Sequence, residues 1–207
     1  IPYLHLIFLL FAMSGMAQVK EIGLPSIKNF RKTEYKGGTQ NWDIDQDSSG
    51  NLYFANNNGL LQFDGLSWEE HKIPNSIAVR SVKVDDASGR IFVGGYNEFG
   101  YFEADNNGKL IYTSISNLVD TSKTELTDFI WKIHTYEDEI VFQSFLKIYI
   151  FKNNKVIHID APKRFQFSFS VNNELYFQDI KLGILHYHDG KLIPLKGTEV
   201  LKNTEIW

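Results

Sequence analysis

The stretch Asn41–Trp68, NWDIDQDSSGNLYFANNNGLLQFDGLSW, decides the fold, because the rest of the chain repeats its plan. Within it, the aromatic-rich segment 51–55 follows a Ser-Ser-Gly turn, and the segment 60–63 lies between Asn-Asn-Gly and Asp-Gly turns. Turn residues between short runs of this kind predict antiparallel strands joined by hairpins. A third strand at 42–46 leads in, and a fourth begins at Trp68. We therefore predict a sheet of four short antiparallel strands.

Three further units repeat this order of strands and turns. The first apolar residue after the first turn marks each unit, and the four markers are Leu52, Ile91, Ile140 and Leu175. The markers are separated by 39, 49 and 35 residues (52 to 91, 91 to 140 and 140 to 175), close to the roughly 40–50 residues of a propeller blade. A single four-stranded blade cannot bury both of its faces and needs neighbours. The pattern therefore predicts an all-β fold of β-propeller blades, each with four antiparallel strands.

The predicted blades span residues 41–75, 76–120, 121–160 and 161–196, and residues 197–207 open a fifth unit. Trp207 stands in this last unit where Trp42 and Trp131 stand in theirs. A ring with an unpaired partial strand would expose sheet edges. We therefore expect a fragment of a larger propeller, with about four blades plus the start of a fifth. The alternative is an irregular four-bladed propeller closed by the leader, residues 18–40, which forms either an outer strand or a loop laid over a blade.

The first 17 residues have the pattern of an export signal. Apolar Ile1–Ala12 is followed by the small residues Ser14, Gly15 and Ala17, which match an h-region and a cleavage site. We predict a signal peptide over residues 1–17, cleavage after Ala17 and a periplasmic mature chain. A membrane anchor is the alternative, although about twelve apolar residues are fewer than the roughly twenty of a spanning helix. A charged n-region and an initiator Met are missing, so we expect the gene to begin upstream.

Composition and motifs disfavour several classes of function. The chain has 207 residues, of which 43% are hydrophobic and 14% aromatic, and this is ample for a packed core. Its net charge of −4 is spread along the chain, which disfavours nucleic-acid contact by this segment. The absence of cysteine excludes disulfides and thiolate metal sites. No nucleophile elbow, Walker loop, His-Glu-x-x-His helix or dinucleotide fingerprint occurs, so we expect no catalytic residue and no cofactor.

Alternating acids lie near the start of the first unit. Asp43, Asp45 and Asp47 resemble the start of a calcium loop, but Ser48 and Phe54 stand where such a loop needs Gly and Glu. Alternation places the three carboxylates on one face of the strand, and we predict a solvated face leading into a turn. The same solvated placement is predicted for acids at other turns and strand ends. These are Glu69-Glu70, Asp85-Asp86 and Glu137-Asp138-Glu139.

Histidines and tryptophans are the remaining candidates. The run His186-Tyr187-His188 puts two imidazoles on the same side of a strand, which suits a metal ion. No carboxylate or third histidine sits at a spacing that completes the site, so we predict an exposed rim feature and no metal. The other histidines are His5, His71, His134 and His158. The tryptophans are predicted to pack between blades, with stacking on a sugar ring at a propeller mouth as the alternative; they are Trp42, Trp68, Trp131 and Trp207.

The unit from Trp42 to Trp68 resembles the two-component regulator propeller repeat. The resemblance rests on its runs Gln-Asp-x-x-Gly-Asn-Leu-Tyr-Phe and Asn-Asn-x-Gly-Leu-Leu-x-Phe-Asp-Gly, and segments 23–35 and 94–102 also look like the N-terminal portion of that group. It covers most of residues 18–207, closely in the first two units and loosely in the others. The resemblance implies the periplasmic sensor region of a bacterial regulator, followed by further propeller units, a triple-tyrosine domain, one transmembrane helix and a cytoplasmic histidine-kinase or helix-turn-helix output.

The same resemblance implies a carbohydrate fragment or another small molecule as ligand, a homodimer formed through the full-length protein, and membrane contact only through a downstream helix. It assigns no ligand-binding residue, because the matching residues are turns and strand cores. The sequence thus predicts a non-catalytic, ligand-sensing segment. Two alternatives stay open: a protein-binding scaffold, and an exported glycosidase or lyase, since propeller enzymes of that kind assemble their acids from separate blades.

Overall fold

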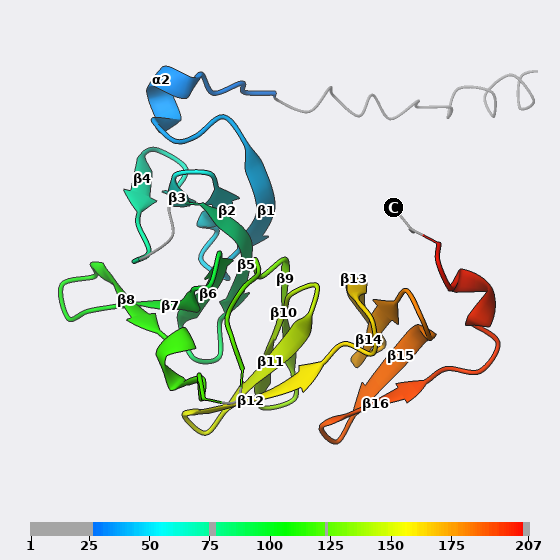
Figure 1. Cartoon of the computed structure of the whole chain (residues 1–207). Helices are drawn as coiled ribbons and strands as arrows, with labels where there is room; N and C mark the ends of the chain where they lie inside the picture. Colours follow the sequence, from blue (N-terminus) through cyan, green and yellow to red (C-terminus); the bar gives the residue numbers. More distant parts are fainter. Residues whose placement is uncertain (1–26, 75–77, 123, 205–207) are drawn as a thin grey trace, which may run out of the picture. The chain divides into compact units, whose positions relative to one another are not determined.

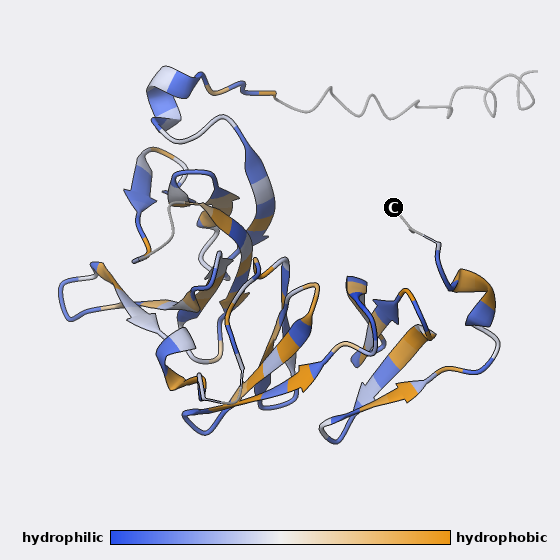
Figure 2. Ribbon diagram, in the orientation of Figure 1, coloured by the Kyte–Doolittle hydropathy of each residue, from blue (hydrophilic) through white to orange (hydrophobic). Residues whose placement is uncertain are grey.

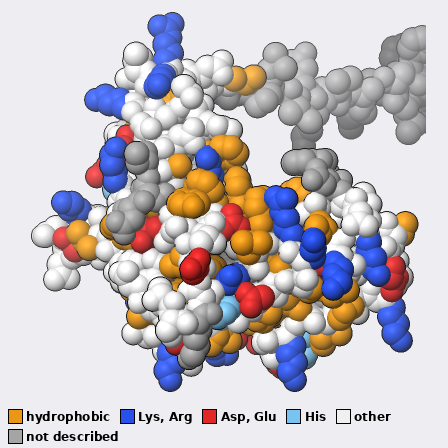
Figure 3. Space-filling model, in the orientation of Figure 1, with side chains coloured by type: hydrophobic (Ala, Val, Ile, Leu, Met, Phe, Trp, Pro, Cys, Tyr) orange, Lys and Arg blue, Asp and Glu red, His pale blue; other side chains and the backbone are white. Residues whose placement is uncertain are grey.

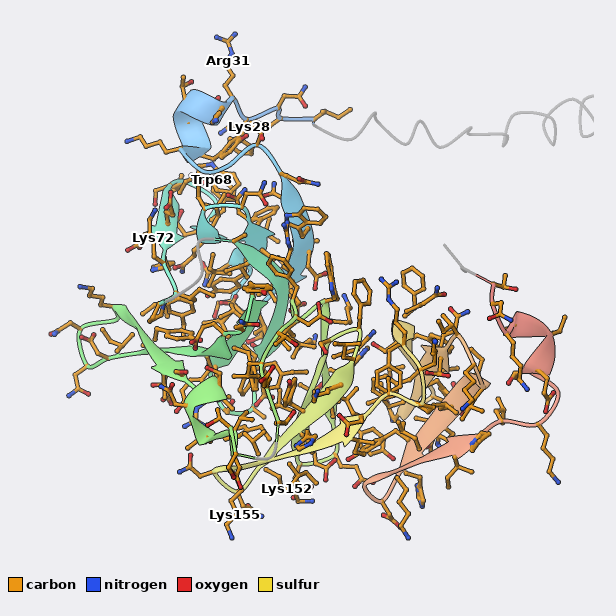
Figure 4. All side chains as sticks on the ribbon, viewed as in Figure 1. Lys28, Arg31, Trp68, Lys72, Lys152 and Lys155 are labelled. Carbon is orange, nitrogen blue, oxygen red and sulfur yellow. The ribbon has the colours of Figure 1, made fainter. Side chains whose placement is uncertain are left out.

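The computed structural model describes residues 27–74, 78–122 and 124–204. The predicted signal peptide, its cleavage site after Ala17, His5 and Trp207 lie outside these residues. The chain divides into two compact units, Ile1–Phe30 and Arg31–Trp207, and the second contains all the described strands. In the described part of the first unit, the Lys28 ammonium lies 4.4 Å from the centre of the Phe30 ring (Figure 4).

The second unit contains four four-stranded antiparallel sheets, each built from consecutive strands (Figure 1). The first sheet consists of β1 (Asn41–Gln46), β2 (Leu52–Asn56), β3 (Gly59–Phe63) and β4 (Trp68–His71). The second consists of β5 (Val79–Asp85), β6 (Arg90–Gly95), β7 (Phe99–Ala104) and β8 (Leu110–Ser114). The third consists of β9 (Lys132–Tyr136), β10 (Glu139–Gln143), β11 (Lys147–Lys152) and β12 (Lys155–Asp160). The fourth consists of β13 (Phe165–Val171), β14 (Glu174–Asp179), β15 (Gly183–His188) and β16 (Lys191–Pro194).

Helical structure in the described residues is confined to single turns. These are α2 (Lys32–Tyr35), η2 (Ser116–Leu118) and η3 (Glu199–Leu201). None of these helices is long or apolar enough to cross a membrane. The prediction of an all-β fold with four-stranded antiparallel blades is therefore confirmed.

Short turns made of hydrophilic residues set the register of the hairpins. Asn153 and Asn154 join β11 to β12 with φ angles of 49° and 58°, and Asn172 and Asn173 join β13 to β14 with φ angles of 51° and 64°. Two-residue turns of this kind need positive φ at both positions, and asparagine adopts it more readily than most residues. Hydrophilic residues likewise form the turns that follow β11 and β15 (Figure 2). The local sequence therefore dictates where each strand ends.

Apolar side chains join each sheet to the next in sequence order. One core cluster joins the first and second sheets, another the second and third, and another the third and fourth. Fully buried members include Leu60 and Val93 in the first cluster, Phe99 and Phe142 in the second, and Phe177 and Tyr187 in the third. Among the described residues, no core cluster joins the fourth sheet back to the first. The second and third sheets thus bury both faces against neighbouring sheets, as propeller blades do, whereas the first and fourth each bury one face in this way.

Gly37 and Gly38, near the end of the leader, pack against the first sheet. The Gly38 N–H donates to Asn56 Oδ1 at 2.7 Å, and Asn56 Nδ2 donates back to the Gly38 carbonyl at 3.0 Å. A Cβ at Gly37 would come within 2.6 Å of a Leu61 methyl carbon. This close approach buries Leu61 without a second sheet on that side.

Candidate functional site

The first strands of the four sheets lie side by side and run in the same direction. β1 lies beside β5, β5 beside β9, and β9 beside β13 (Figure 1). Val82 N–H donates to Asp43 Oδ2, and two residues further along both strands Val84 N–H donates to Asp45 Oδ2. The residue numbers rise together on the two strands, so β1 and β5 are parallel. Because the first strands run parallel, the residues that begin them gather at one end. We call this end the mouth.

A cavity of about 470 Å³ opens at the mouth. Its walls come from the beginnings of β1, β9 and β13 and from the turn between β10 and β11, so three of the four sheets contribute. The lining residues are Trp42, Asp43, Trp131, Lys132, Gln143, Phe145, Arg164, Gln166, Phe167 and Ser168. In the space-filling view, hydrophobic side chains gather in the middle of the visible face with charged side chains beside them (Figure 3).

Aromatic rings form one wall of this cavity. Trp42 and Trp131 meet edge to face with ring centres 6.0 Å apart, and Trp131 lies 5.1 Å from Phe145. The Arg80 guanidinium lies 3.7 Å from the centre of the Trp42 ring, and that of Arg164 lies 4.2 Å from Phe145. A guanidinium over an aromatic face is attracted by the quadrupole of the ring. The wall is thus a row of rings, with Arg164 beside Phe145 and Arg80 next to both Trp42 and Trp131.

Two polar atoms beside these rings have no hydrogen-bond partner among the described residues. Trp131 Nε1 and Gln166 Oε1 are both buried, and neither bonds to a protein group. Buried polar atoms are nearly always paired, because an unpaired one keeps its desolvation cost. Both atoms are shielded from solvent, so a ligand in the cavity would bond to them only after a small movement of the neighbouring side chains.

Hydrogen-bonded side chains from β9, β10 and β13 lie beneath the cavity. Ser168 Oγ donates to Gln143 Oε1, and His134 Nε2 lies 2.7 Å from Ser168 Oγ. Because the serine proton points to the glutamine, His134 Nε2 carries a proton and donates to Ser168. A histidine that activates a serine must instead accept the serine proton. This arrangement fixes side chains in place and prepares no nucleophile.

The charge of His134 follows from its surroundings. Burial lowers its pKa to about 4, and the positive charges of Lys132 and Lys83 act in the same direction. The imidazole is therefore neutral at neutral pH.

The predicted solvated face of Asp43 and Asp45 is wrong. The exposed side chains of β1 are those that alternate with them, Trp42 at 38% and Ile44 at 54% exposure. Asp43 accepts from Lys132 Nζ at 3.0 Å and from a backbone N–H of β5. β5 is the edge of its own sheet, so its outward N–H groups need acceptors that its sheet does not supply. Aspartates on the neighbouring inner strand supply them.

Asp45 makes the same kind of connection two residues on. It accepts from Lys83 Nζ and from the Val84 N–H, each at 2.8 Å. Burial opposes ionisation of its carboxyl, but the hydrogen bonds from Lys83, Val84 and Gln46 outweigh burial and lower its pKa. Asp47 instead closes the following turn, where it accepts from the Ser49 N–H at 3.0 Å. The alternating acids are thus a structural link between sheets.

Four of the seven paired acids at other turns are exposed, as predicted, whereas Glu70, Asp85 and Glu139 are partly buried. Glu139 accepts from the Tyr187 hydroxyl at 2.7 Å and lies 3.4 Å from Lys152 Nζ, with a side chain only 16% exposed. Lys152 stands at the end of β11 (Figure 4). Glu139 therefore connects the third sheet to the fourth. The exposed acids are Glu69, Asp86, Glu137 and Asp138.

The structure also changes the interpretation of the histidine pair. Glu174 Oε2 lies 2.6 Å from His186 Nε2, so the prediction that no carboxylate completes the set of His186 and His188 is wrong. Glu174 comes from the neighbouring strand, and only the strand register brings it close. Of the other histidines, His71 is buried, with its Nε2 3.0 Å from Gln62 Oε1, and His158 is partly buried on β12.

The tryptophans among the described residues divide into two groups. Trp42 and Trp131 lie at the mouth, whereas Trp68 stacks on Phe63 within the first sheet at 4.6 Å (Figure 4). The tryptophans were predicted to pack between blades, with stacking at a propeller mouth as the alternative; the equivalent positions of Trp42 and Trp131 in their units are a signal that could have pointed to the mouth. Arg164 and Phe145 carried no such signal, because they lie in connections between strands.

Comparison with known proteins bears on the fold. Neither a family model nor a curated protein matches this sequence. The solved structures that resemble it include the following three. The extracellular domain of a putative one-component system from B. thetaiotaomicron is 16% identical over 72% of this chain, with a TM-score of 0.54. Virginiamycin B lyase from Staphylococcus aureus is 12% identical over 80% of it, with a TM-score of 0.59. The WD40 β-propeller domain of Doa1 is 13% identical over 77% of it, with a TM-score of 0.57.

The chain spans only part of each of these structures. It covers 20% of the extracellular domain, 58% of the lyase and 55% of the WD40 domain. The three proteins differ in function, and their identities to this chain are low. What they share with it is the fold, and the chain is a β-propeller protein.

Proposed function

We propose that this chain is the ligand-sensing β-propeller portion of a bacterial transmembrane regulator of the two-component regulator propeller kind. In this proposal, the signal peptide exports the segment to the periplasm and the segment itself is non-catalytic. The observation that carries the proposal is the cavity at the mouth, with its aromatic wall and its unpaired Trp131 Nε1 and Gln166 Oε1.

The chemistry of the cavity suits a small molecule with both apolar faces and hydroxyl groups. Ligand sites typically combine apolar and aromatic walls with a few polar groups that fix orientation. A sugar ring has C–H faces that stack on aromatic rings and hydroxyls that bond to amide oxygens and indole N–H groups. Trp131 and Gln166 offer these partners, and Arg164 adds a cation at the rim. An oligosaccharide fragment is therefore the ligand class that we propose.

Two further observations support a sensor. The unit from Trp42 to Trp68 resembles a repeat of periplasmic sensor regions. One solved structure with the same fold is the extracellular domain of a putative one-component system. A second is the extracellular domain of a putative hybrid two-component system.

An enzyme acting on polysaccharide is the competing function, and one of the similar structures is a lyase. Glycoside hydrolysis generally uses two carboxylates that flank the scissile bond. The described lining of the cavity holds one carboxylate, Asp43, and Lys132 already neutralises it at 3.0 Å. The arrangement therefore favours binding over cleavage.

The signal would pass through rigid-body motion. Because neighbouring sheets share packed cores, a propeller moves as a rigid body more readily than it deforms. A ligand would therefore act by stabilising one arrangement of the two chains of a dimer relative to another. In this proposal the full-length protein is a homodimer, anchored in the inner membrane by a downstream helix.

The test is calorimetric titration of the chain with a panel of neutral and acidic oligosaccharides. We expect at least one to bind, and we expect Trp131→Leu to weaken it by about tenfold through the loss of ring stacking and the indole N–H. Trp68→Leu is the matched control, because Trp68 stacks on Phe63 away from the mouth.

Three outcomes would count against the proposal. Either no oligosaccharide binds, or the Trp131 and Trp68 variants bind equally well. Release of shorter products during the titration, lost in Asp43→Asn, would favour the enzyme instead.

A further inference from the structure

The fourth sheet brings three potential metal ligands onto one face. Leu175 pairs with Tyr187 and Tyr176 with His186 across β14 and β15. Continuing this antiparallel register by one residue places Glu174 opposite His188. Residues two apart on a strand point to the same face, so Glu174, His186 and His188 share one.

The three side chains are close enough to hold one ion. One ligand atom from each lies within 4.8 Å of the other two. The shortest separation is 2.6 Å, between His186 Nε2 and Glu174 Oε2, and the two imidazole rings lie nearly parallel with centres 5.8 Å apart. The side chains are 27%, 44% and 53% exposed for His186, Glu174 and His188, so solvent ions reach them.

The surrounding residues hold His186 and the two ligand-bearing strands in place. Tyr176 stacks on the His186 ring at 5.0 Å and 25°, and Phe169 stacks on Tyr176 at 5.8 Å. On the opposite face, Leu175 and Tyr187 are fully buried against the third sheet. The two strands that carry the ligands are therefore anchored, and only the exposed side chains of Glu174 and His188 lose conformational freedom when an ion binds.

We propose that Glu174, His186 and His188 form a binding site for a divalent transition-metal ion, with Zn²⁺ as the ion that suits them. Two imidazoles and a carboxylate are a ligand set that zinc prefers, whereas Mg²⁺ and Ca²⁺ prefer oxygen ligands alone. From the sequence alone we expected no metal here, because nothing in the spacing of Glu174 indicated that it lies beside the two histidines.

The geometry needs only small adjustments. Metal–ligand distances of about 2.1 Å at tetrahedral angles put ligand atoms about 3.4 Å apart. The Glu174–His186 pair, now 2.6 Å apart, would open by less than about 1 Å, and His188 would approach by rotating its side chain. Asp189 Oδ2, which lies 3.4 Å from His188 Nε2, or a water molecule would take the fourth position. Lys191, which pairs with His188 across β15 and β16, adds a positive charge nearby and moderates the affinity.

This site is independent of the proposed sensor function. It shares no residue with the lining of the mouth cavity. A bound ion would clamp β14 to β15 and leave a coordination position for a water or an outside donor.

The test is calorimetric titration of the chelator-treated chain, made without a histidine tag, with ZnCl₂ and with MgCl₂. We expect one Zn²⁺ per chain and no heat of binding from Mg²⁺. His186→Gln and His188→Gln should each weaken Zn²⁺ binding by about tenfold or more, since even the loss of a supporting residue costs that much. His158→Gln is the matched control, because His158 lies on β12 outside the site and should leave binding unchanged.

Folding and coordination are checked separately. Circular dichroism establishes that each variant keeps the strand content of the natural chain. With Cu²⁺ as a probe, electron paramagnetic resonance should show two nitrogen ligands in the natural chain and one in each of the two ligand variants. The proposal is overturned if the natural chain binds no Zn²⁺, or if the His186 and His188 variants bind it as tightly as the His158 variant.

Discussion

Replacement of the buried histidine beneath the mouth should change how stability depends on pH. His134 lies on β9, where its Nε2 donates to Ser168 Oγ of β13 and burial keeps the ring neutral. His134→Gln keeps a hydrogen-bonding side chain at this position but removes the titrating group. We therefore expect the variant to differ from the natural chain mainly in its response to acid.

The size of the effect follows from the pKa of His134 in the two states. The folded chain holds it at about 4, against the ordinary value of 6.5 in the unfolded chain. Below pH 6.5 the His134 side chain is protonated in the unfolded chain but stays neutral in the folded chain until about pH 4. The stabilisation present above pH 6.5 is therefore lost as the pH falls towards 4. Between pH 7 and pH 4 this loss is about 3 kcal/mol. His71, whose pKa burial also lowers, acts in the same range in both proteins, so their comparison cancels it.

Urea unfolding followed by tryptophan fluorescence, at intervals between pH 4 and pH 8, measures this difference. The natural chain should lose about 3 kcal/mol more than His134→Gln on going from pH 7 to pH 4. Equal losses in the two proteins, or a larger loss in the variant, would refute the assignment of a neutral buried imidazole at this position.

Three other substitutions test the contacts between sheets. Asp45→Ala removes the acceptor of two hydrogen bonds from β5 and should lower the free energy of unfolding, measured in urea, by about 1–3 kcal/mol. An unchanged urea midpoint would contradict the link between the first two sheets. Gly94→Ala would place a Cβ 2.5 Å from Ile130 and should lower stability by about 1–3 kcal/mol; a melting temperature equal to that of the natural chain would show that the two sheets are less tightly packed there. Arg80→Met removes the guanidinium that lies 3.7 Å from the Trp42 ring and should cost about 1–2 kcal/mol, with a shift in tryptophan emission; an unchanged emission spectrum would argue against the stacked pair.

The strands were predictable from sequence because the information that sets them is local. Asparagine, glycine and aspartate turns stand between short apolar runs, and the positive φ angles of Asn153 and Asn172 are where such turns require them. Repetition of the unit then predicts sheets that pack in sequence order. Local patterns of this kind do not depend on distant residues.

The failures share one cause, which is contact between residues far apart in the chain. Asp43 looked solvated because its partner, Lys132, lies 89 residues away on β9. Glu139 looked like a turn acid because the Tyr187 hydroxyl comes from another sheet. Glu174 was missed beside His186 because only the register of β14 and β15 brings them together. Alternation along a strand predicts which side chains share a face of the sheet, but not which of the two faces is covered by a neighbouring sheet.

The cavity at the mouth was partly visible in the sequence. Trp42 and Trp131 occupy the same position in their units, and the parallel inner strands bring such positions to one end. Arg164, Gln166 and Phe145 complete the lining from connections and strand starts that carry no motif. Their assembly depends on the order in which the sheets pack.

The most direct test of the sensor proposal is a nuclear magnetic resonance titration that follows the indole N–H signals of the tryptophans. The chain has four tryptophans, and Trp68 serves as an internal control because it stacks within the first sheet. We predict that a binding oligosaccharide shifts the signals of Trp131 and Trp42 in a saturable manner and leaves that of Trp68 unchanged. If no oligosaccharide moves the Trp131 signal, or if Trp68 shifts as much as Trp131, ligand binding at the mouth is contradicted.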